Sequence, residues 1–149
     1  DWVDVDAGLE HACAVKDDGR MFCWGFNGGG QLGMGDFGPV SVPTEIAGSI
    51  EDFVSVSAGS GHTCGLTSDG SAYCWGVNNF GQLGVAGGLP LTSPVPEATL
   101  STWSHLSAGQ DHTCGIRGCR NGCRIRRGRA RAPRRGRAGW SWRTRRRRR

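Results

Sequence analysis

The sequence of 149 residues lacks long apolar runs and helical periodicity. No stretch approaches the roughly 20 apolar residues that a membrane-spanning helix needs, so neither a span nor a membrane partner is expected. No window keeps apolar residues at helical spacing over three turns. The chain is instead rich in glycine, with 26 residues, and five of its six prolines lie between 39 and 96. Short strands separated by such turn residues indicate an all-β fold.

Positive charge is scarce in the first part of the chain, and negative charge is missing from the last part. All 13 acidic residues lie within 1–111, and no lysine or arginine lies between Arg20 and Arg117. Residues 1–116 therefore carry a formal charge of −11, whereas 117–149 hold 16 arginines and no acid. The net charge of +5 describes neither part, and an acidic body favours, weakly, a basic partner surface.

A long motif is repeated. Segment 7–33 returns as 58–84 with 14 identities in 27 positions, and both copies end in Cys-Trp-Gly followed by Gly-Gln-Leu-Gly. The shorter pattern Ala-Gly-x-x-His-x-Cys occurs a third time from Ala108, after offsets of 51 and 50 residues. A fixed period of this length indicates a repeat architecture.

The cysteines of each repeat face one another across an expected hairpin. Asp17-Asp18-Gly19 suits a three-residue loop with glycine in the left-handed position. Counting back from that loop places Cys13 opposite Cys23, and the loop Ser68-Asp69-Gly70 likewise places Cys64 opposite Cys74. Opposed residues lie near disulfide reach, so we expect two disulfides. Packed free thiols and zinc are the alternatives, although the Cys-x9-Cys spacing differs from that of zinc knuckles.

No catalytic or cofactor site is evident. The sequence shows no nucleophile–base pair and no paired carboxylates at an obvious spacing. Its glycine-rich loops lack the Lys-Ser/Thr of a phosphate loop. His112, Cys114, Cys119 and Cys123 have a zinc-like spacing, but the repeat already explains the first two. We therefore expect no catalytic residue, no metal and no cofactor.

The remaining repeated residues are expected to be structural. Histidines that recur in every unit favour a side-chain bond holding the turn after Ala-Gly. The apolar runs Met21–Trp24 and Ala72–Trp75 suit strands buried on both faces. Glycine marks bends, and asparagine bonds nearby backbone. The expected structural set is His11, Trp24, Gly25, Asn27, Gln31, Gly33, His62, Trp75, Gly76, Asn78, Gln82, Gly84 and His112.

These residues resemble the repeat of the regulator of chromosome condensation family: Ala-Gly-x-x-His, Asp-Gly, then Trp-Gly-x-Asn-x-x-Gly-Gln-Leu-Gly. The resemblance covers 1–116, with units at about 20–68 and 71–117 and a partial unit ahead. It implies a β-propeller with four antiparallel strands per blade and seven blades when closed. Such a ring needs about 350 residues at this period, so we expect two to two-and-a-half blades of a longer propeller.

The resemblance also implies possible roles. The founding type is a nucleotide exchange factor for the GTPase Ran that docks on nucleosomes; others are scaffolds, and some bacterial members inhibit an enzyme such as β-lactamase. We expect a non-catalytic protein-interaction module that uses the loops Gly28–Gly30, Asp36–Val40 and Val85–Pro90. Exchange activity on a small GTPase is the alternative, although no exchange residue can be transferred to these blades.

Cysteine stands where this family often has alanine or serine, which resembles a bacterial, exported variant. Disulfides would then indicate a secreted or cell-surface location, and the alternative is the cytoplasm. The chain starts at Asp1 without an initiator methionine or a signal peptide, so we expect a cut or processed N-terminus.

The repeat stops where a third Cys-Trp-Gly is due, at 124–126. Three interpretations of the arginine-rich segment 117–149 are open. It is a nucleic-acid-binding arm in which Trp140 and Trp142 stack on bases, a solvated disordered tail, or GC-rich coding sequence read in a shifted frame. The absence of lysine and the abrupt onset favour the frame shift. Nucleic acid is expected as a partner only through this segment.

Overall fold

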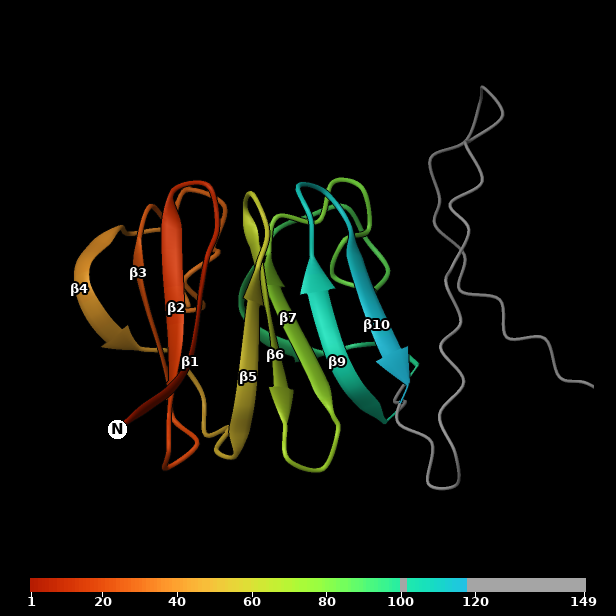
Figure 1. The fold of residues 1–149 in the computed structure, drawn as a ribbon. Coiled ribbons are helices and arrows are strands. Elements are labelled where there is room, and N and C mark those ends of the chain that lie inside the picture. The colour runs from red at the N-terminus through yellow and green to blue at the C-terminus, as the bar shows by residue number, and fades with distance from the viewer. Residues whose placement is uncertain (100–101, 118–149) are drawn as a thin grey trace, which may run out of the picture.

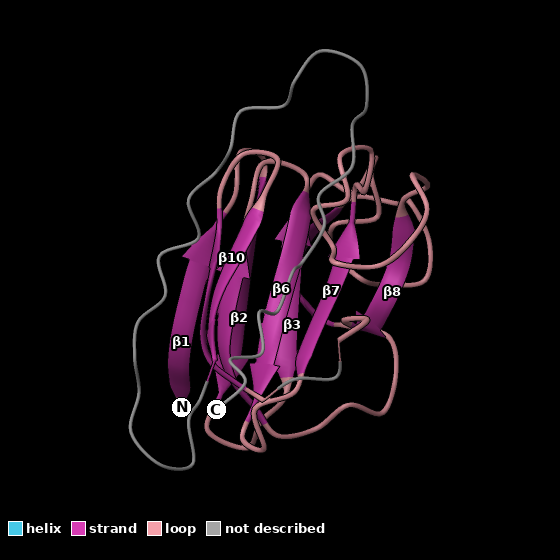
Figure 2. Cartoon of the chain, turned by 90° about the vertical axis from the view of Figure 1, so that its right-hand side faces the viewer, coloured by secondary structure: helices cyan, strands magenta, loops and turns pink. Residues whose placement is uncertain are grey.

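The computed structural model describes residues 1–99 and 102–117. This part of the chain contains strands and no helix, as Figure 2 shows. The strands are β1 (Trp2–Ala7), β2 (His11–Lys16), β3 (Met21–Gly25), β4 (Val40–Glu45), β5 (Phe53–Ala58), β6 (His62–Thr67), β7 (Ala72–Gly76), β8 (Leu91–Pro96), β9 (Trp103–Ala108) and β10 (Thr113–Arg117).

The strands form three antiparallel sheets. The first contains β1 to β4 in chain order, the second β5 to β8, and the third β9 and β10. The sheets stand side by side (Figure 1), and their first strands, β1, β5 and β9, contact one another in that order. This is the expected partial β-propeller: two four-stranded blades and half of a third.

Local sequence sets the register of the hairpins. Cys13 lies opposite Cys23 and Cys64 opposite Cys74, as the loop count predicts. Both pairs are disulfides with Cα–Cα distances of 4.1 Å. Gly19 supplies the positive φ of 80° that its loop requires, and a Cβ there would also lie 2.5 Å from a backbone nitrogen. The two disulfides therefore follow from a turn and a count of residues.

The core lies between sheets and consists of two separate clusters. The first joins the first and second sheets and contains Cys13, Val15, Met21, Cys23, Leu32, Ile46, Phe53, Val56 and Trp75. The second joins the second and third sheets and contains Cys64, Leu66, Ala72, Cys74, Leu83 and Leu106. Stability thus depends on how completely neighbouring sheets cover one another.

The prediction that both Cys-Trp strands are buried on two faces is right for β7 and wrong for β3. Trp75 is fully buried, whereas Trp24 is only partly buried. The second sheet lies between two others, but the described residues place no sheet on the outer face of the first. Burial of these tryptophans is therefore set by the neighbouring sheet rather than by the strand.

Several predictions concern residues outside the described part of the chain. They are the disordered, frame-shifted or nucleic-acid-binding tail, with Trp140 and Trp142, and the cysteines at 119 and 123. No helix able to cross a membrane is found in the described residues.

Candidate interaction surface and the contacts that hold it

The connections after β3 and β7 are held by buried asparagine side chains. Asn27 is fully buried, and its Nδ2 donates to the carbonyl oxygens of Asp36 and Gly38 at 3.1 and 3.0 Å. Its Oδ1 accepts from Leu32 N at 2.9 Å. Gln31 adds a bond from Gly29 N to its Oε1 at 2.8 Å. These side-chain bonds therefore fix a connection that has no strand of its own.

The second connection repeats this arrangement. Asn78 Nδ2 donates to the carbonyl oxygen of Gly87 at 2.8 Å, and its Oδ1 accepts from Leu83 N at 3.2 Å. Gln82 Oε1 accepts from Phe80 N at 3.0 Å. Two connections of different sequence are thus held in one shape by the shared Asn and Gln.

The glycines that precede these connections allow close backbone approach. Gly25 and Gly76 have φ of 111° and 101°. A Cβ on either would lie 2.5 Å from a carbonyl oxygen, that of Glu10 or Gly61. The bend after Cys-Trp-Gly therefore requires glycine for both space and conformation.

One end of the sheets displays large apolar side chains. We define the loop face as the turns and connections 8–10, 26–39, 59–61, 77–90 and 109–112, which an antiparallel order places at the same end of the sheets (upper end in Figure 1). Five large apolar residues here are about half exposed or more: Leu9, Phe26, Phe37, Phe80 and Leu89. They lie on fixed connections, so their exposure is a property of the folded scaffold.

The charge of the loop face has a single sign. It contains Glu10, Asp36 and Asp111 and neither lysine nor arginine. Lys16 and Arg117 end strands at the opposite end of the sheets. Arg20 lies there too and pairs with Asp18 at 2.8 Å. The loop face is therefore apolar and acidic.

Each of the two interfaces between the described sheets contains a buried histidine. His11 Nε2 lies 2.9 Å from Thr63 Oγ1, which itself donates to the carbonyl oxygen of Gln31 at 2.8 Å. Because that hydroxyl proton is used, His11 donates from Nε2. The ring also covers the glycine of its own Ala-Gly turn, since a Cβ at Gly8 would lie 2.3 Å from Cε1.

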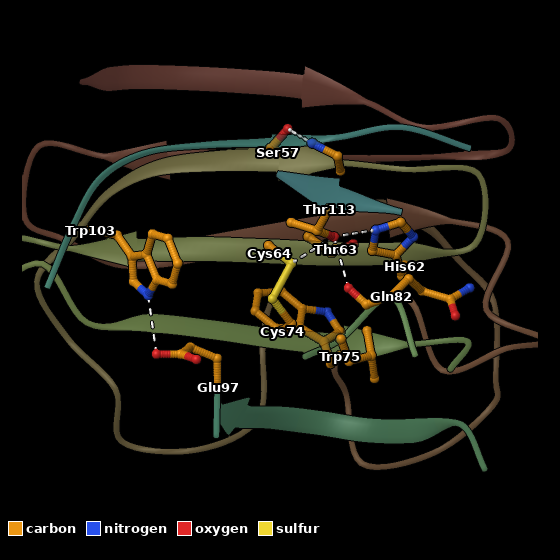
Figure 3. The surroundings of a disulfide bond; sticks show 12 residues. Ser57, His62, Thr63, Cys64, Cys74, Trp75, Gln82, Glu97, Trp103 and Thr113 are labelled. Atoms are coloured by element: carbon orange, nitrogen blue, oxygen red, sulfur yellow. Dashed lines mark hydrogen bonds between the residues drawn. A yellow bond between two sulfur atoms is a disulfide. The ribbon is translucent and has the colours of Figure 1, made fainter. Parts of the chain in front are cut away.

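The second histidine makes the same bonds to the third sheet. His62 Nε2 lies 2.9 Å from Thr113 Oγ1, and Thr113 donates to the carbonyl oxygen of Gln82 at 2.8 Å (Figure 3). His112 is exposed and its ring lies against Gly109. The prediction that the histidine side chains bond the turn after Ala-Gly is therefore wrong for His11 and His62. Their rings bond a threonine of the next sheet and only pack against the glycine of their own turn.

Burial keeps both bridging histidines neutral. Desolvation lowers the pKa of His11 to about 4, partly opposed by the charge of Asp6, and desolvation likewise lowers the pKa of His62 to about 4. In both rings Nδ1 is buried without a hydrogen-bond partner. Protonation would place an unpaired N–H in the core, so these imidazoles act as fixed hydrogen-bond donors.

The cysteines of the two hairpins are not metal ligands. Their sulfur atoms are joined in disulfides, so they cannot supply the thiolates that zinc binds. Cys114 is a free, exposed thiol. Within 1–99 and 102–117, no group of three or more His, Cys, Asp or Glu side chains is placed to hold a metal.

Two kinds of contact between sheets were missed from sequence. Asp4 and Asp6 of β1 each accept a backbone N–H of β5, from Val56 and Ala58, at 2.8 Å. At the next interface Ser57 accepts from Ala108 N at 3.0 Å. The accepting side chain changes from a carboxylate in one unit to a hydroxyl in the next, so comparison of the repeats does not reveal this contact. The bridging threonines could have been noticed: Thr63 directly follows His62 and Thr113 directly follows His112, whereas alanine follows the histidine of the first unit.

Antiparallel four-stranded sheets that pack on one another through their first strands define a β-propeller built from sequence repeats. The chain belongs to the regulator of chromosome condensation (RCC1) repeat family. A model of this repeat matches residues 18–66 and 69–116, and a second model of the same repeat matches 2–31 and 53–82.

Related proteins are much longer. The chain is 35% identical over 115 residues to the human probable E3 ubiquitin-protein ligase HERC3, a match covering 74% of this chain and 11% of HERC3. It is 40% identical over 92 residues to the ultraviolet-B receptor UVR8 of Arabidopsis thaliana, covering 61% of this chain and 21% of UVR8. The chain thus spans about a tenth to a fifth of these relatives.

Solved structures share the fold. Human WBSCR16 superposes with a TM-score of 0.71 at 20% identity, over 78% of this chain and 31% of that one. Yeast RCC1 (Prp20), solved bound to Kap60, superposes with a TM-score of 0.69 at 22% identity, over 76% and 29%. At these identities the likeness concerns the fold alone.

Proposed function

We propose that this chain is a non-catalytic propeller module that binds another protein through the loop face. The observation that carries the proposal is the set of five exposed apolar side chains on connections held by buried asparagines. Large apolar side chains on a rigid support bind with little loss of conformational entropy. Three of the five are phenylalanines, and aromatic residues are enriched at protein interfaces.

The charge of the loop face restricts the partner. The loop face combines its apolar residues with Glu10, Asp36 and Asp111 and has no lysine or arginine. A partner surface that combines apolar and basic residues is complementary to it, and this charge pairing mainly speeds association. The acidic loop face repels nucleic acid, which is negatively charged.

The experiment compares two triple variants of the full chain in quantitative cross-linking followed by mass spectrometry in the native host. Phe37→Ser, Phe80→Ser and Leu89→Ser remove apolar side chains from the loop face. Val3→Ser, Val42→Ser and Val54→Ser are the matched control, because these valines are exposed on strands. Cross-links from the loop face should fall roughly tenfold or more in the first variant only. Equal loss in both variants would refute the proposal.

A small GTPase is one partner class to be tested, because the family resemblance includes an exchange factor. Release of labelled GDP from such a GTPase is measured with and without the chain. A faster release would assign exchange activity to the chain. An unchanged rate would mean that the loop face binds a partner of another class.

The chain is further proposed to be part of a longer propeller. The partly buried Trp24 supports this proposal. It lies on the outer face of the first sheet, whereas its equivalent in the second sheet, Trp75, is completely buried because a neighbouring sheet covers it. The two disulfides support a secreted or cell-surface location, since such bonds persist in oxidising compartments.

A further inference from the structure

The three Ala-Gly turns form an open hollow on the loop face. The turns follow β1, β5 and β9, come from consecutive sheets and lie at the same end of the structure (Figure 1). The hollow between them has a volume of about 470 Å³ and is lined by Gly8, Gly59 and Gly109 and by the residue after each glycine. Ligand pockets in proteins have volumes of about 300–1,000 Å³, so the hollow is large enough for a side chain of a partner.

Glycine lets these turns pack closely on one another. A Cβ at Gly8 would lie 2.3 Å from the carbonyl oxygen of Gly59, and a Cβ at Gly59 would lie 2.5 Å from that of Gly109. The turns therefore meet through their main chains, with no side chain between them. Because glycine leaves the peptide groups uncovered, a ligand can approach the backbone of the hollow directly.

The N–H groups of the three Ala-Gly pairs are all used within the chain. Each of the three glycines donates to the carbonyl oxygen of the histidine three positions later, at 2.8 Å. The amides of Ala7 and Ala58 donate to the carboxylate of Asp6 at 2.9 and 2.8 Å. The amide of Ala108 donates to Ser57 Oγ at 3.0 Å. These pairs therefore offer a ligand no free hydrogen-bond donor.

Acceptors at the hollow, in contrast, have no donor. No N–H or O–H of the described residues donates to the carbonyl oxygen of Gly59 or Gly109. The rings of His11 and His62 are more than nine-tenths buried, and their Nδ1 atoms are unpaired acceptors because the proton is on Nε2. Each Nδ1 is directed at the glycine of its own turn, 2.6 Å from a Cβ at Gly8 and 2.5 Å from one at Gly59. The hollow is thus rich in electron pairs and poor in protons.

Carboxylates add negative charge to this arrangement. Asp6 bonds the alanines of the first two turns, and Glu10 and Asp111 belong to the first and third turns. The charge of Asp6 raises the pKa of His11 and that of Asp111 raises the pKa of His62, in both cases against the larger effect of burial. Both carboxylates therefore act on the imidazoles behind the hollow, and the loop face has no lysine or arginine to neutralise them.

These features specify a ligand that donates several hydrogen bonds, accepts none and is positively charged. Among protein side chains, arginine fits best, since its planar guanidinium has five N–H donors and no acceptor. A guanidinium is also less strongly hydrated than the ammonium of lysine, so it costs less to transfer from water to an interface. Leu9 lies at the hollow with 75% of its surface exposed, and it can pack against the methylene stem of an arginine.

We propose that the hollow binds the guanidinium group of an arginine that projects from the partner protein of the loop face. The guanidinium donates to the free carbonyl oxygens of the turns, and Asp6, Glu10 and Asp111 balance its charge. Its stem lies against Leu9. This inference rests on the proposed function, because it names a residue that the partner supplies.

The experiment measures the binding of the peptide acetyl-Gly-Arg-Gly-amide to the full, ¹⁵N-labelled chain by amide NMR titration. One comparison peptide contains citrulline, which is similar in shape to arginine but uncharged, and a second contains lysine. All three peptides are added to the same folded protein. The arginines of residues 117–149 are present in every titration, so they do not distinguish one peptide from another.

Two double variants of the chain test the contribution of charge. Glu10→Gln with Asp111→Asn removes two carboxylates from the turns of the hollow. Glu51→Gln with Asp52→Asn is the matched control, because both residues are exposed and lie next to Gly19, at the opposite end of the sheets. The two variants change the net charge of the chain by the same amount.

We expect the arginine peptide to bind about tenfold more tightly than the citrulline peptide, because its hydrogen bonds are charge-assisted. The largest shifts should be those of the amides in the three Ala-Gly turns. The first variant should weaken arginine binding roughly fivefold, and the control should leave it unchanged.

Three results would overturn the proposal: no binding of the arginine peptide, equal affinity for arginine and citrulline, or shifts confined to other parts of the chain. Equal affinity for arginine and lysine would overturn the assignment to a guanidinium. Each of these results leaves the loop-face proposal standing, since cross-linking of the variants at Phe37, Phe80 and Leu89 tests that proposal separately.

Discussion

The two interfaces between the described sheets are built from the same repeated residues, yet only one of these two is complete. Between the first and second sheets, Phe53, Val56 and Trp75 are all buried. Between the second and third sheets, Leu106 is buried, Trp103 is only partly buried, and a pocket takes the place that the indole of Trp75 has in the first interface. The comparison shows that one repeat supplies the residues on one side of an interface and that the neighbouring repeat supplies those on the other side.

Hydrogen bonds make the same point. Both interfaces contain the His–Thr–carbonyl bridge with bonds of 2.8 and 2.9 Å. The bridge needs only the second strand of the following sheet, which both interfaces possess. The bond from the Trp75 indole to the carbonyl oxygen of Gln31 needs the third strand, which only the first interface possesses among the described residues. Completeness of the sheet therefore decides which contacts form.

The largest effect should distinguish Trp75 from Trp24. Trp75→Ala leaves a cavity between the first two sheets and removes the buried hydrogen bond to Gln31, so it should lower the free energy of unfolding by about 3–5 kcal/mol. Trp24→Ala removes the same side chain from a partly buried position and should cost about 1 kcal/mol. Urea unfolding of the full chain measures both. Equal losses would contradict the conclusion that the neighbouring sheet sets the burial of these tryptophans.

Acid should weaken both interfaces through His11 and His62. The pKa of each is lowered to about 4 by burial, whereas an unfolded histidine titrates near 6.5. Below pH 6.5 the unfolded chain binds protons that the folded chain does not bind, so the free energy of unfolding falls as the pH is lowered to 4. Above pH 6.5 the stability that these neutral histidines contribute is fully present. At pH 4.5 the loss should be roughly 2–3 kcal/mol for each imidazole.

Urea midpoints between pH 7 and 4.5 measure this loss. This pH range lies above the titration of Asp17, Asp18 and Asp69, so protonation of these carboxylates does not contribute to the loss. Their pKa values are lowered by hydrogen bonds to the N-terminus, Arg20 and Thr67, respectively. His11→Asn should remove about half of the pH dependence, and so should His62→Asn. If one variant removed all of it, the two interfaces would not be equivalent.

Reduction of the disulfides should destabilise the two hairpins equally. Each bridge has a sequence separation of 10 residues, for which loss of the cross-link costs about 2–3 kcal/mol in the chain-entropy model. Cys13→Ser with Cys23→Ser is compared with Cys64→Ser with Cys74→Ser by thermal unfolding. A much larger effect of the second pair would show that the incomplete interface relies more on its bridge.

The smallest effect should separate the inner contacts of the two interfaces. Asp6→Ala removes a carboxylate that accepts from Ala58 N at 2.8 Å and from Ser57 Oγ at 3.2 Å, and it should cost about 1.5–3 kcal/mol. Ser57→Ala removes a neutral acceptor for Ala108 N and should cost about 1 kcal/mol. Asp6→Asn is the control, because it keeps one acceptor oxygen. A larger loss for Ser57→Ala would reverse the comparison.

Sequence reasoning was most successful where contacts are local. The Asp-Asp-Gly loop determines its hairpin, and the count from that loop pairs Cys13 with Cys23. Asn27 was expected to bond nearby backbone and does so within the same connection, 5 to 11 residues away. Each of these depends on a turn whose residues are adjacent in sequence.

The candidate site was predicted in part. The loops Gly28–Gly30, Asp36–Val40 and Val85–Pro90 lie on the loop face except for Val40, which begins β4, but Leu9, Phe26 and Phe80 belong to the loop face as well. Those side chains were not singled out from sequence, because apolar character alone does not reveal which end of a sheet a residue occupies. The partner of His11 could not be predicted either, because Thr63 lies 52 residues away in another sheet.

The sequence by itself determined the repeat, the family, the hairpin registers and the disulfide pairs, because each follows from a period or from a turn that spans about ten residues. The tertiary structure decided which of two identical Cys-Trp-Gly motifs is buried, which carbonyl receives an indole and which cysteine stays free. These outcomes depend on the presence of the next sheet, and the free energy of packing lies between sheets rather than within the strand that carries the motif.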